Sequence, residues 1–399
     1  MNLSLVPTSN DQNKIEMIRA QMPAVTRAVY LNTGTNGPLM KRAVDAITEF
    51  AHEELNNGRI GQPAFDRLLA LVDESRALVA ELLACDVDEV ALTHNTTEGM
   101  NIALLGLDWR AGDELVTATS EHEGGLNPAA LLKARYGVNV IYTDIGLCDC
   151  DPVFSLQRAL SPRTKAVVLS HVSWTTGAVL PMRELCEMAH RVGAFVICDA
   201  AQACGMVPSR VDELGVDLYA LSGQKWLCGP DGIGALFIRR EVMPKIQNTF
   251  SGYFALKQRV ARSDAEIEFG ETAMRYQYAF HYFPALLGFN EGLKWLRDEI
   301  GWEWIYQRTR ELGCYAYDEL SKLPNVKLYM PRAEIAGLVH FSVDGIAPAD
   351  LTARLYEKNV LIRHVPEPLL NRVATGFFNN EQDVMQLCNA IRAVSGENA

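Results

Sequence analysis

Lys225 and Asp199 are the two residues whose types and surroundings point most directly to chemistry. Asp199 ends an apolar run, residues 195–198, that is typical of a buried strand, and Lys225 lies in a glycine-rich stretch, residues 222–234. A lysine amine can hold an aldehyde as a Schiff base, while a buried carboxylate can keep a pyridine nitrogen protonated. Pyridoxal phosphate chemistry needs this pair, so we predict this cofactor and a catalytic role for both residues.

The stretch 94–101 is predicted to bind the phosphate of the cofactor. It follows a strand-like run and opens a helix, and the free amides at a helix N-terminus bind anions. The hydroxyls of Thr96 and Thr97 would add donors, whereas a plain helix cap is the alternative interpretation. Ser222 and Gln224, close to the lysine, are further candidate donors.

Two more residues are candidates for contacts with the cofactor ring. Gln202 can donate to a phenolic oxygen, and His122 follows a predicted strand, from which it can stack on the ring face. The alternatives are a structural role for the histidine and a structural arginine as the partner of Asp199, because an unpaired buried carboxylate is costly.

An arginine pair is predicted to hold the substrate. Arg363 and Arg372 lie nine residues apart. A planar guanidinium binds a carboxylate with two parallel hydrogen bonds, which would fix the α-carboxylate of an amino acid. From its position, the loop that contains Asn36 is a further candidate for selecting the substrate side chain, together with Arg59 and the aromatic segment 276–283.

Seven short apolar runs alternate with helical patterns in the first two thirds of the chain. This alternation predicts an α/β fold with a mainly parallel seven-stranded sheet between helices, and polar residues at the carboxyl ends of its strands. We therefore predict an N-terminal arm (residues 1–25), a large cofactor-binding domain (26–260) and a small α+β C-terminal domain with the interdomain connection (261–399). The predicted strands are 90–93, 114–118, 138–143, 166–170, 194–198, 218–222 and 234–238.

Composition limits the partners and the compartment. With 37 basic and 49 acidic residues the net charge is −12, which argues against nucleic acid or an anionic membrane as a partner. The N-terminus lacks the features of a secretion signal, and we expect no membrane span. Nine cysteines without a paired framework favour reduced thiols in the cytoplasm. Cys148 and Cys150 have no second ligand pair nearby, so no metal site is predicted.

These motifs together resemble the class V aminotransferase group of fold-type I pyridoxal phosphate enzymes, which includes cysteine desulfurases, isopenicillin N epimerases and cysteine/cystine C–S lyases. Residues 199–202 (D-A-A-Q), 222–225 (S-G-Q-K) and 229–234 (G-P-D-G-I-G) carry the resemblance, which extends from Tyr30 to about Leu387.

The resemblance implies a role for each matching residue. Lys225 would be the Schiff-base lysine and Thr272 the threonine that reaches the phosphate of a neighbouring subunit, which implies a homodimer with shared active sites. The remaining matches are Asp199 with the pyridinium, Gln202 with the phenolic oxygen, His122 on the ring, Thr97 and Ser222 with the phosphate, and Arg372 with the substrate carboxylate.

Departures from the family pattern narrow the predicted reaction. Gln224 stands where the family usually has histidine, and Trp174, which we assign to the cofactor pocket, lies where many desulfurases have asparagine. Residues 366–368 contain no cysteine, whereas a desulfurase needs a thiol there to accept sulfur. The cysteine/cystine C–S lyases also have a tryptophan in the stretch that corresponds to 171–177, lack the loop cysteine, and have two arginines with the spacing of Arg363 and Arg372. A β-elimination that releases sulfur from an amino acid is therefore the favoured prediction.

Other activities use the same residues and stay open. Protonation at the opposite face of the substrate would give an epimerase, and protonation at the cofactor carbon would give an aminotransferase. A binding or regulatory module without turnover is a further alternative, although the presence of both Lys225 and Asp199 argues against it. A dinucleotide-binding loop is not supported, because the glycines at 229–234 do not follow a strand and open a helix.

Overall fold

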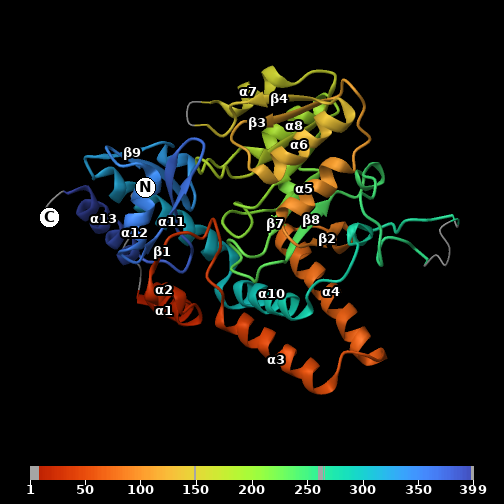
Figure 1. Ribbon diagram of the computed structural model, residues 1–399, viewed down its shortest axis with the longest axis horizontal. Helices are drawn as coiled ribbons and strands as arrows, with labels where there is room; N and C mark the ends of the chain where they lie inside the picture. The colour runs from red at the N-terminus through yellow and green to blue at the C-terminus, as the bar shows by residue number, and fades with distance from the viewer. Residues whose placement is uncertain (1–8, 148–149, 259–263, 265, 397–399) are drawn as a thin grey trace.

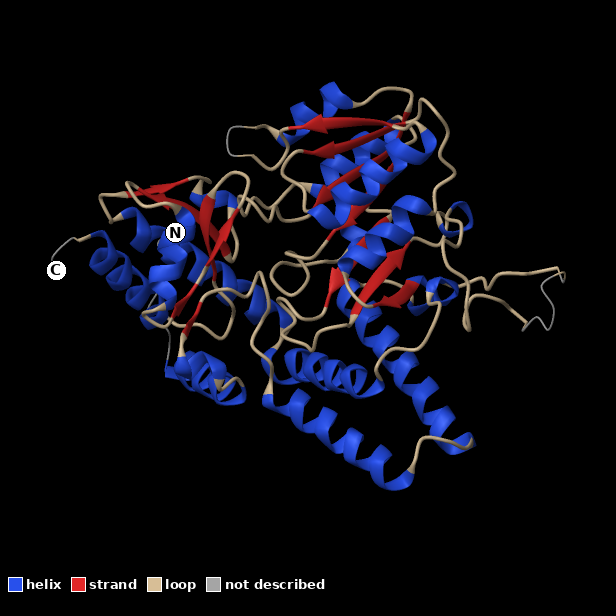
Figure 2. Ribbon diagram, viewed as in Figure 1, coloured by secondary structure: helices blue, strands red, loops and turns tan. Residues whose placement is uncertain are grey.

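The computed structural model describes residues 9–147, 150–258, 264 and 266–396. A large unit with a central sheet between layers of helices lies beside a smaller unit built mainly from the C-terminal third of the chain (Figures 1 and 2). Cys148 of the C-x-C pair lies outside the described residues.

The central sheet has seven strands in the order β2-β8-β7-β6-β5-β3-β4. Only β8 runs against its neighbours, so the prediction of an α/β fold with a mainly parallel seven-stranded sheet is confirmed. The strands are β2 (Val90–Thr93), β3 (Glu114–Ala118), β4 (Asn139–Thr143), β5 (Thr164–Ser170), β6 (Phe195–Asp199), β7 (Leu218–Ser222) and β8 (Gly234–Ile238).

Both faces of this sheet are covered by a hydrophobic core. Successive side chains of a strand point to opposite faces, so one strand contributes to both cores. In β5, Val167 and Leu169 belong to one hydrophobic core, while Ala166 and Val168 belong to the other. Predominantly apolar runs are therefore what the central strands of this sheet require.

Helices of the large unit pack on both sides of the sheet (Figure 1). They are α3 (Lys41–Asn57), α4 (Gln62–Leu83), α5 (Thr96–Leu105), α6 (Glu123–Tyr136), α7 (Pro152–Ala159), α8 (Met182–Arg191), α9 (Val211–Leu214) and α10 (Phe283–Trp295). Single 3-10 turns cover Val87–Glu89, Met243–Lys245, Ala273–Tyr276 and Arg332–Glu334, and a π-helical turn, Leu296–Ile300, extends α10. Helices α10 and α11 (Trp302–Ser321) lead from the large unit to the small one (Figure 1).

The small unit has a four-stranded antiparallel sheet in the order β12-β13-β10-β9. Its strands are β9 (Val326–Leu328), β10 (Leu338–Val343), β12 (Arg363–Val365) and β13 (Leu370–Ala374). Helices α11, α12 (Pro348–Tyr356) and α13 (Glu381–Ser395) complete it. Arg372 lies inside β13, where it is fully buried.

The beginning of the chain packs on this small unit. Strand β1 (Val29–Tyr30) pairs in parallel with β11 (Val360–Leu361), and α1 (Ser9–Gln21) and α2 (Ala24–Arg27) lie beneath the unit in Figure 1. Ile18 of α1 and Met22, which follows this helix, share a core with Phe377 and Phe378. Among the described residues, no helix is long and apolar enough to cross a membrane.

Candidate active site

A cavity of about 290 Å³ opens at the carboxyl edge of the central sheet, where the small unit meets it. The residues that follow β2, β3, β6 and β7 reach it from the large unit, and β12 and β13 reach it from the small unit. Its lining consists of Gly34, Thr35, Asn95, Thr96, Thr97, His122, Trp174, Asp199, Ala201, Gln202, Ser222, Gln224, Lys225, Arg363 and Arg372.

Asp199 and Lys225 lie together in this cavity. Asp199 ends β6 and is buried, and its Oδ1 accepts a hydrogen bond from the Ala201 amide at 2.8 Å. Removal from water lowers the pKa of Lys225 to about 8; the positive Arg372 and Arg363 add to this effect, and negative Asp199 opposes it. At pH 7 about a tenth of this amine is therefore neutral, and so nucleophilic, far more than for an ordinary lysine.

The N-terminus of α5 forms a polar corner of the cavity. The Thr96 amide donates to Ser222 Oγ at 3.0 Å, and the two hydroxyls lie 2.6 Å apart. Asn95 caps the helix by accepting from the Glu98 amide. Gln224 Oε1 is buried without a hydrogen-bond partner among the described residues. Hydroxyls and backbone amides at a helix N-terminus fit an anion such as a phosphate.

His122 and Trp174 lie on one side of the cavity. His122 Nδ1 accepts from the Gly124 amide at 3.0 Å, and its ring meets the Trp174 ring edge-on at 5.0 Å between centroids. Burial lowers the pKa of His122, so the ring is neutral and can stack on another ring. Trp174 Nε1 is buried with no partner in the described part of the chain.

Gln202 lies across the cavity, and its amide is oriented by two hydrogen bonds. Its Nε2 donates to the Gly34 carbonyl at 2.8 Å, and its Oε1 accepts from Trp226 Nε1 at 3.0 Å. The second Nε2 hydrogen stays available as a donor. A Cβ on Gly34 would lie 2.9 Å from Gln202 Oε1 and 3.1 Å from Arg372 Nη2, so a side chain here would displace the ends of two cavity side chains.

The two arginines lie opposite each other on neighbouring strands of the small sheet. Arg363 in β12 and Arg372 in β13 are register partners, although like charges at such positions repel. Arg372 is fully buried, and burial together with Arg363 lowers its pKa to about 9. No acidic side chain pairs with either arginine among the described residues. A buried and a half-buried guanidinium at a cavity, neither paired with any acid that the structure describes, are a site for an anion.

The structure brings most of the predicted site residues together. Eleven of the thirteen line the cavity: Thr96, Thr97, His122, Trp174, Asp199, Gln202, Ser222, Gln224, Lys225, Arg363 and Arg372. Asn36 and Thr272 are not in its lining. Asn36 is exposed beside the cavity, where its carbonyl accepts from the Tyr30 hydroxyl, and Thr272 precedes the turn Ala273–Tyr276.

Sequence reasoning missed Glu121, which lies next to His122 in the chain. Its carboxylate accepts from the amide and the hydroxyl of Ser170, the register partner of Asp199. Burial, with a contribution from Asp199, raises the pKa of Glu121 to about 8 although the bonds from Ser170 oppose this. Glu121 is therefore mainly neutral at pH 7 and adds no second full charge behind Asp199. The loop 32–36, which we predicted to take part in substrate selection, reaches the cavity through Gly34 and Thr35, although the sequence did not single out either residue.

A larger groove of about 1020 Å³ lies away from this cavity. Its walls come from β4, α7 and β9, with Phe154, Lys327 and Tyr329 among the lining residues. None of the predicted site residues lies in it. Size alone therefore does not identify the site, whereas the convergence of Lys225, Asp199 and the arginine pair does. No group of three metal-binding side chains occurs in the described part of the chain.

Comparison with known proteins gives a consistent result. The sequence profile of the family "Aminotransferase class-V" matches residues 29–387. A cysteine desulfurase from Haloferax volcanii is 29% identical over 92% of this chain and 89% of its own length.

Two solved structures of the protein C-DES are similar to the whole fold. The complex of the cystine C–S lyase C-DES with its product cysteine persulfide has a TM-score of 0.88 at 29% identity, covering 92% of this chain and 98% of its own. A lysine-to-alanine mutant of C-DES with glycine covalently linked to its pyridoxal phosphate cofactor also has a TM-score of 0.88, at 28% identity, covering 93% and 98% of the two chains.

Proposed function

This chain belongs to the class V aminotransferase family, and on that premise we propose that it is a pyridoxal phosphate-dependent C–S lyase acting on cysteine or cystine. With cystine and one water molecule as reactants, the balanced products are pyruvate, ammonia and cysteine persulfide. The observation that carries the proposal is the single cavity in which Lys225, Asp199 and an unpaired arginine pair converge.

The residues present fit pyridoxal phosphate. The α5 N-terminus with Thr96, Ser222 and Gln224 would hold the phosphate, and Lys225 would hold the aldehyde carbon. Asp199 would pair with the pyridine nitrogen, with His122 against the ring and Gln202 near its phenolic oxygen. When bound, the cofactor supplies an electron sink that stabilises negative charge at the α-carbon of an amino acid.

The residues of the chain then have distinct tasks in the reaction. Arg372 and Arg363 hold the α-carboxylate, which fixes the amino acid in one orientation. Lys225 Nζ, with its lowered pKa, takes the α-proton. The neutral ring of His122 would pack against the cofactor without adding a positive charge. Loss of the sulfur leaving group from the β-carbon completes the elimination.

The connection between β12 and β13 favours a lyase over a desulfurase. It consists of the four exposed residues 366–369 and contains no cysteine. None of the described residues that line the cavity is a cysteine. Without a thiol to accept sulfur in the site, release of a sulfur product is the favoured outcome.

The functional unit in this proposal is a homodimer. Thr272, which is outside the cavity of its own chain, would reach the cofactor phosphate of the partner subunit, as the family resemblance implies. We assign the enzyme to the cytoplasm, a compartment supported by the free thiols of all eight described cysteines. Asn36 would contact the substrate side chain from the edge of the cavity.

Product analysis tests the reaction type. We expect cofactor-loaded enzyme with cystine to release pyruvate and a persulfide product without any keto-acid acceptor. Turnover only in the presence of 2-oxoglutarate would contradict the lyase proposal and identify an aminotransferase. Loss of optical activity without pyruvate would identify an epimerase. Protein that does not bind added pyridoxal phosphate would contradict the enzyme proposal itself.

The pH dependence of cofactor capture tests the lysine. Since the pKa of Lys225 is lowered to about 8 from the ordinary 10.5, covalent capture of pyridoxal phosphate by cofactor-free protein should accelerate with pH and reach half its limiting rate near pH 8. The deprotonated amine is the nucleophile, so the rate rises as pH rises. Visible absorbance would follow capture, with Lys225→Ala as the control. A midpoint near that of a free lysine would contradict this prediction.

A further inference from the structure

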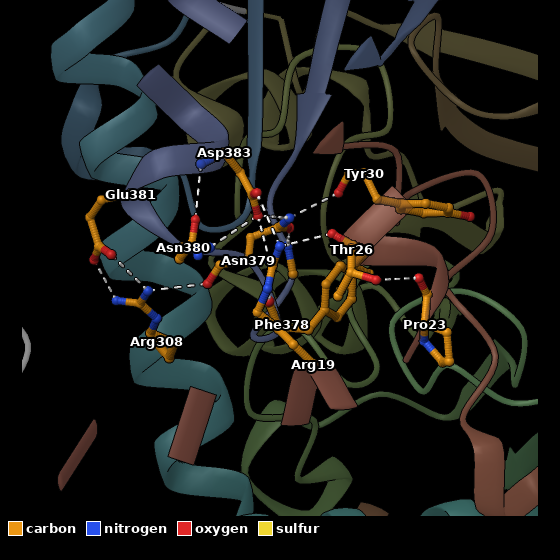
Figure 3. Close-up of polar contacts among 12 residues, drawn as sticks. Arg19, Pro23, Thr26, Tyr30, Arg308, Phe378, Asn379, Asn380, Glu381 and Asp383 are labelled. Carbon is orange, nitrogen blue, oxygen red and sulfur yellow. Dashed lines mark hydrogen bonds and ion pairs between the residues drawn. The ribbon is translucent and has the colours of Figure 1, made fainter. Parts of the chain in front are cut away.

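A buried ion pair fixes the N-terminal segment on the small unit (Figure 3). Arg19 of α1 donates through Nη1 to Asp383 Oδ2 at 2.8 Å and to the Phe378 carbonyl at 3.1 Å. Its Nη2 donates to the Val25 carbonyl at 2.8 Å. The two charged side chains are only 16% and 5% exposed. A guanidinium, unlike an ammonium, can serve these acceptors at once because its donors form a planar fork.

The same cluster holds the chain that follows α2. Asn379 Nδ2 donates both to Asp383 Oδ2 at 2.9 Å and to the Tyr30 carbonyl at 3.0 Å (Figure 3). One residue further, the Ala374 amide donates to the Leu31 carbonyl at 2.9 Å. The N-terminal segment is therefore fastened beside β13, the strand that carries Arg372.

From this anchor the chain continues directly into the active-site cavity. The Gly34 carbonyl accepts from Gln202 Nε2, and the Gly37 amide donates to the Gln224 carbonyl at 2.7 Å. Residues 30–37 thus join the small unit to the large unit across the cavity, and we refer to them as the N-terminal strap. Gln202 and Gln224, the partners of the strap, are themselves cavity residues.

Within the strap, Thr35 touches both arginines. Its Oγ1 accepts from Arg372 Nη2 at 3.1 Å and from Arg363 Nη1 at 3.4 Å. Among the described residues, it is the one side-chain acceptor shared by the pair. Because two facing guanidinium groups repel, an acceptor placed between them sets their relative position before any anion binds.

We propose that Arg19 is a positioning residue for the carboxylate-binding arginines. Its ion pair with Asp383 holds the strap in place, the strap places Thr35 Oγ1, and Thr35 holds Arg372 and Arg363 in the orientation that an α-carboxylate requires. The inference rests on the proposed function, since its ligand is the carboxylate of an amino acid.

The test compares Arg19→Met with Arg308→Met. Arg308 is a matched control: it is 8% exposed, pairs with Glu381 at 2.7 Å and donates to the Asn379 carbonyl at 3.1 Å. It reaches this turn from α11, whereas Arg19 comes from the N-terminal segment and also donates to the Val25 carbonyl, on the way to the strap. The probe is glycine, which carries the α-carboxylate and has no leaving group. Its binding to cofactor-loaded protein is followed by the visible absorbance of the cofactor, and Tm is measured in parallel.

We expect both variants to lower Tm. Only Arg19→Met should weaken glycine binding, by about tenfold or more, because the charged hydrogen bonds from Arg372 and Arg363 to the glycine carboxylate lose their geometry. Thr35→Val should weaken glycine binding as well, and adding it to Arg19→Met should have little further effect, since both act through one contact. Additive effects would overturn the inference.

Two other results would overturn the proposal. One is unchanged glycine affinity in Arg19→Met, and the other is equal weakening in both arginine variants, which would show a general loss of stability. If Arg19→Met does not fold, Arg19→Lys keeps the charge beside Asp383 but cannot serve all three acceptors, so weakened binding is still expected and unchanged affinity overturns the idea. Wild-type protein that binds the cofactor but not glycine would instead overturn the proposed function, and the inference with it.

Discussion

Replacement of Lys225 by alanine is expected to reduce pyruvate formation from cystine by at least about 10³-fold, since one side chain supplies both the covalent anchor and the base. The protein should keep its fold, because the lowered pKa of Lys225 shows that the cavity disfavours its charge. Tm is therefore expected to stay the same or rise slightly. Product assays with added cofactor and thermal unfolding would measure the two quantities.

The control for this substitution is Lys133→Ala, which removes an exposed lysine on α6. It should leave both activity and Tm unchanged. Borohydride reduction followed by peptide mass analysis should label Lys225 in the wild-type protein and in the control. Retention of more than a tenth of the activity in Lys225→Ala would exclude the proposed role of this residue.

The large sheet could be predicted from the sequence because its strands are buried on both faces. Runs such as 90–93 and 218–222 are apolar at all but one position and end at turn or polar residues, and the structure has strands with these same bounds. A strand of this kind can be recognised from its own short stretch of sequence. The order of strands in the sheet has no comparable local signal, since it depends on contacts between distant residues.

The small unit shows where local patterns stop being informative. Its strands β11 and β12 are two and three residues long, too short to show a period. The pairing of Val29–Tyr30 with Val360–Leu361 joins residues more than 300 positions apart, and neither pair has a recognisable motif. Arg19 and Asp383 likewise meet only through the fold.

The same distinction applies to the site. Lys225 and Asp199 could be found because a lysine in a glycine-rich loop and an acid after an apolar run are distinctive. Glu121 could not, because the sequence Glu121-His122-Glu123 does not show which acid is buried; the structure buries the first and exposes the second. Thr35 acts through position alone. A residue whose role depends on its position in the fold, and not on its chemical type, can be identified only from the structure.

Replacement of Arg372 by methionine is the second change with a large expected effect. Loss of charged hydrogen bonds to the substrate carboxylate, at about 1.5–3 kcal/mol each, should lower kcat/KM for cystine by about 10²–10³-fold. Arg372→Lys should recover little of this, because an ammonium cannot bind a carboxylate through two parallel hydrogen bonds. Steady-state kinetics of the three proteins would give these values.

The effect on stability separates this role from a structural one. Arg372 is fully buried, with bonds only to the Thr35 hydroxyl and, at 3.5 Å, the Trp174 carbonyl, and with Nε unpartnered among the described residues. Burial lowers its pKa to about 9, so holding its charge costs folding free energy. An apolar side chain of similar length should therefore leave Tm unchanged or raise it. A structural arginine would behave in the opposite way: Tm would fall by several degrees while kcat/KM stayed near the wild-type value. That combination would remove Arg372 from the substrate site, whereas lost activity in an equally stable protein would mean that the fold keeps this buried charge for the anion that it binds.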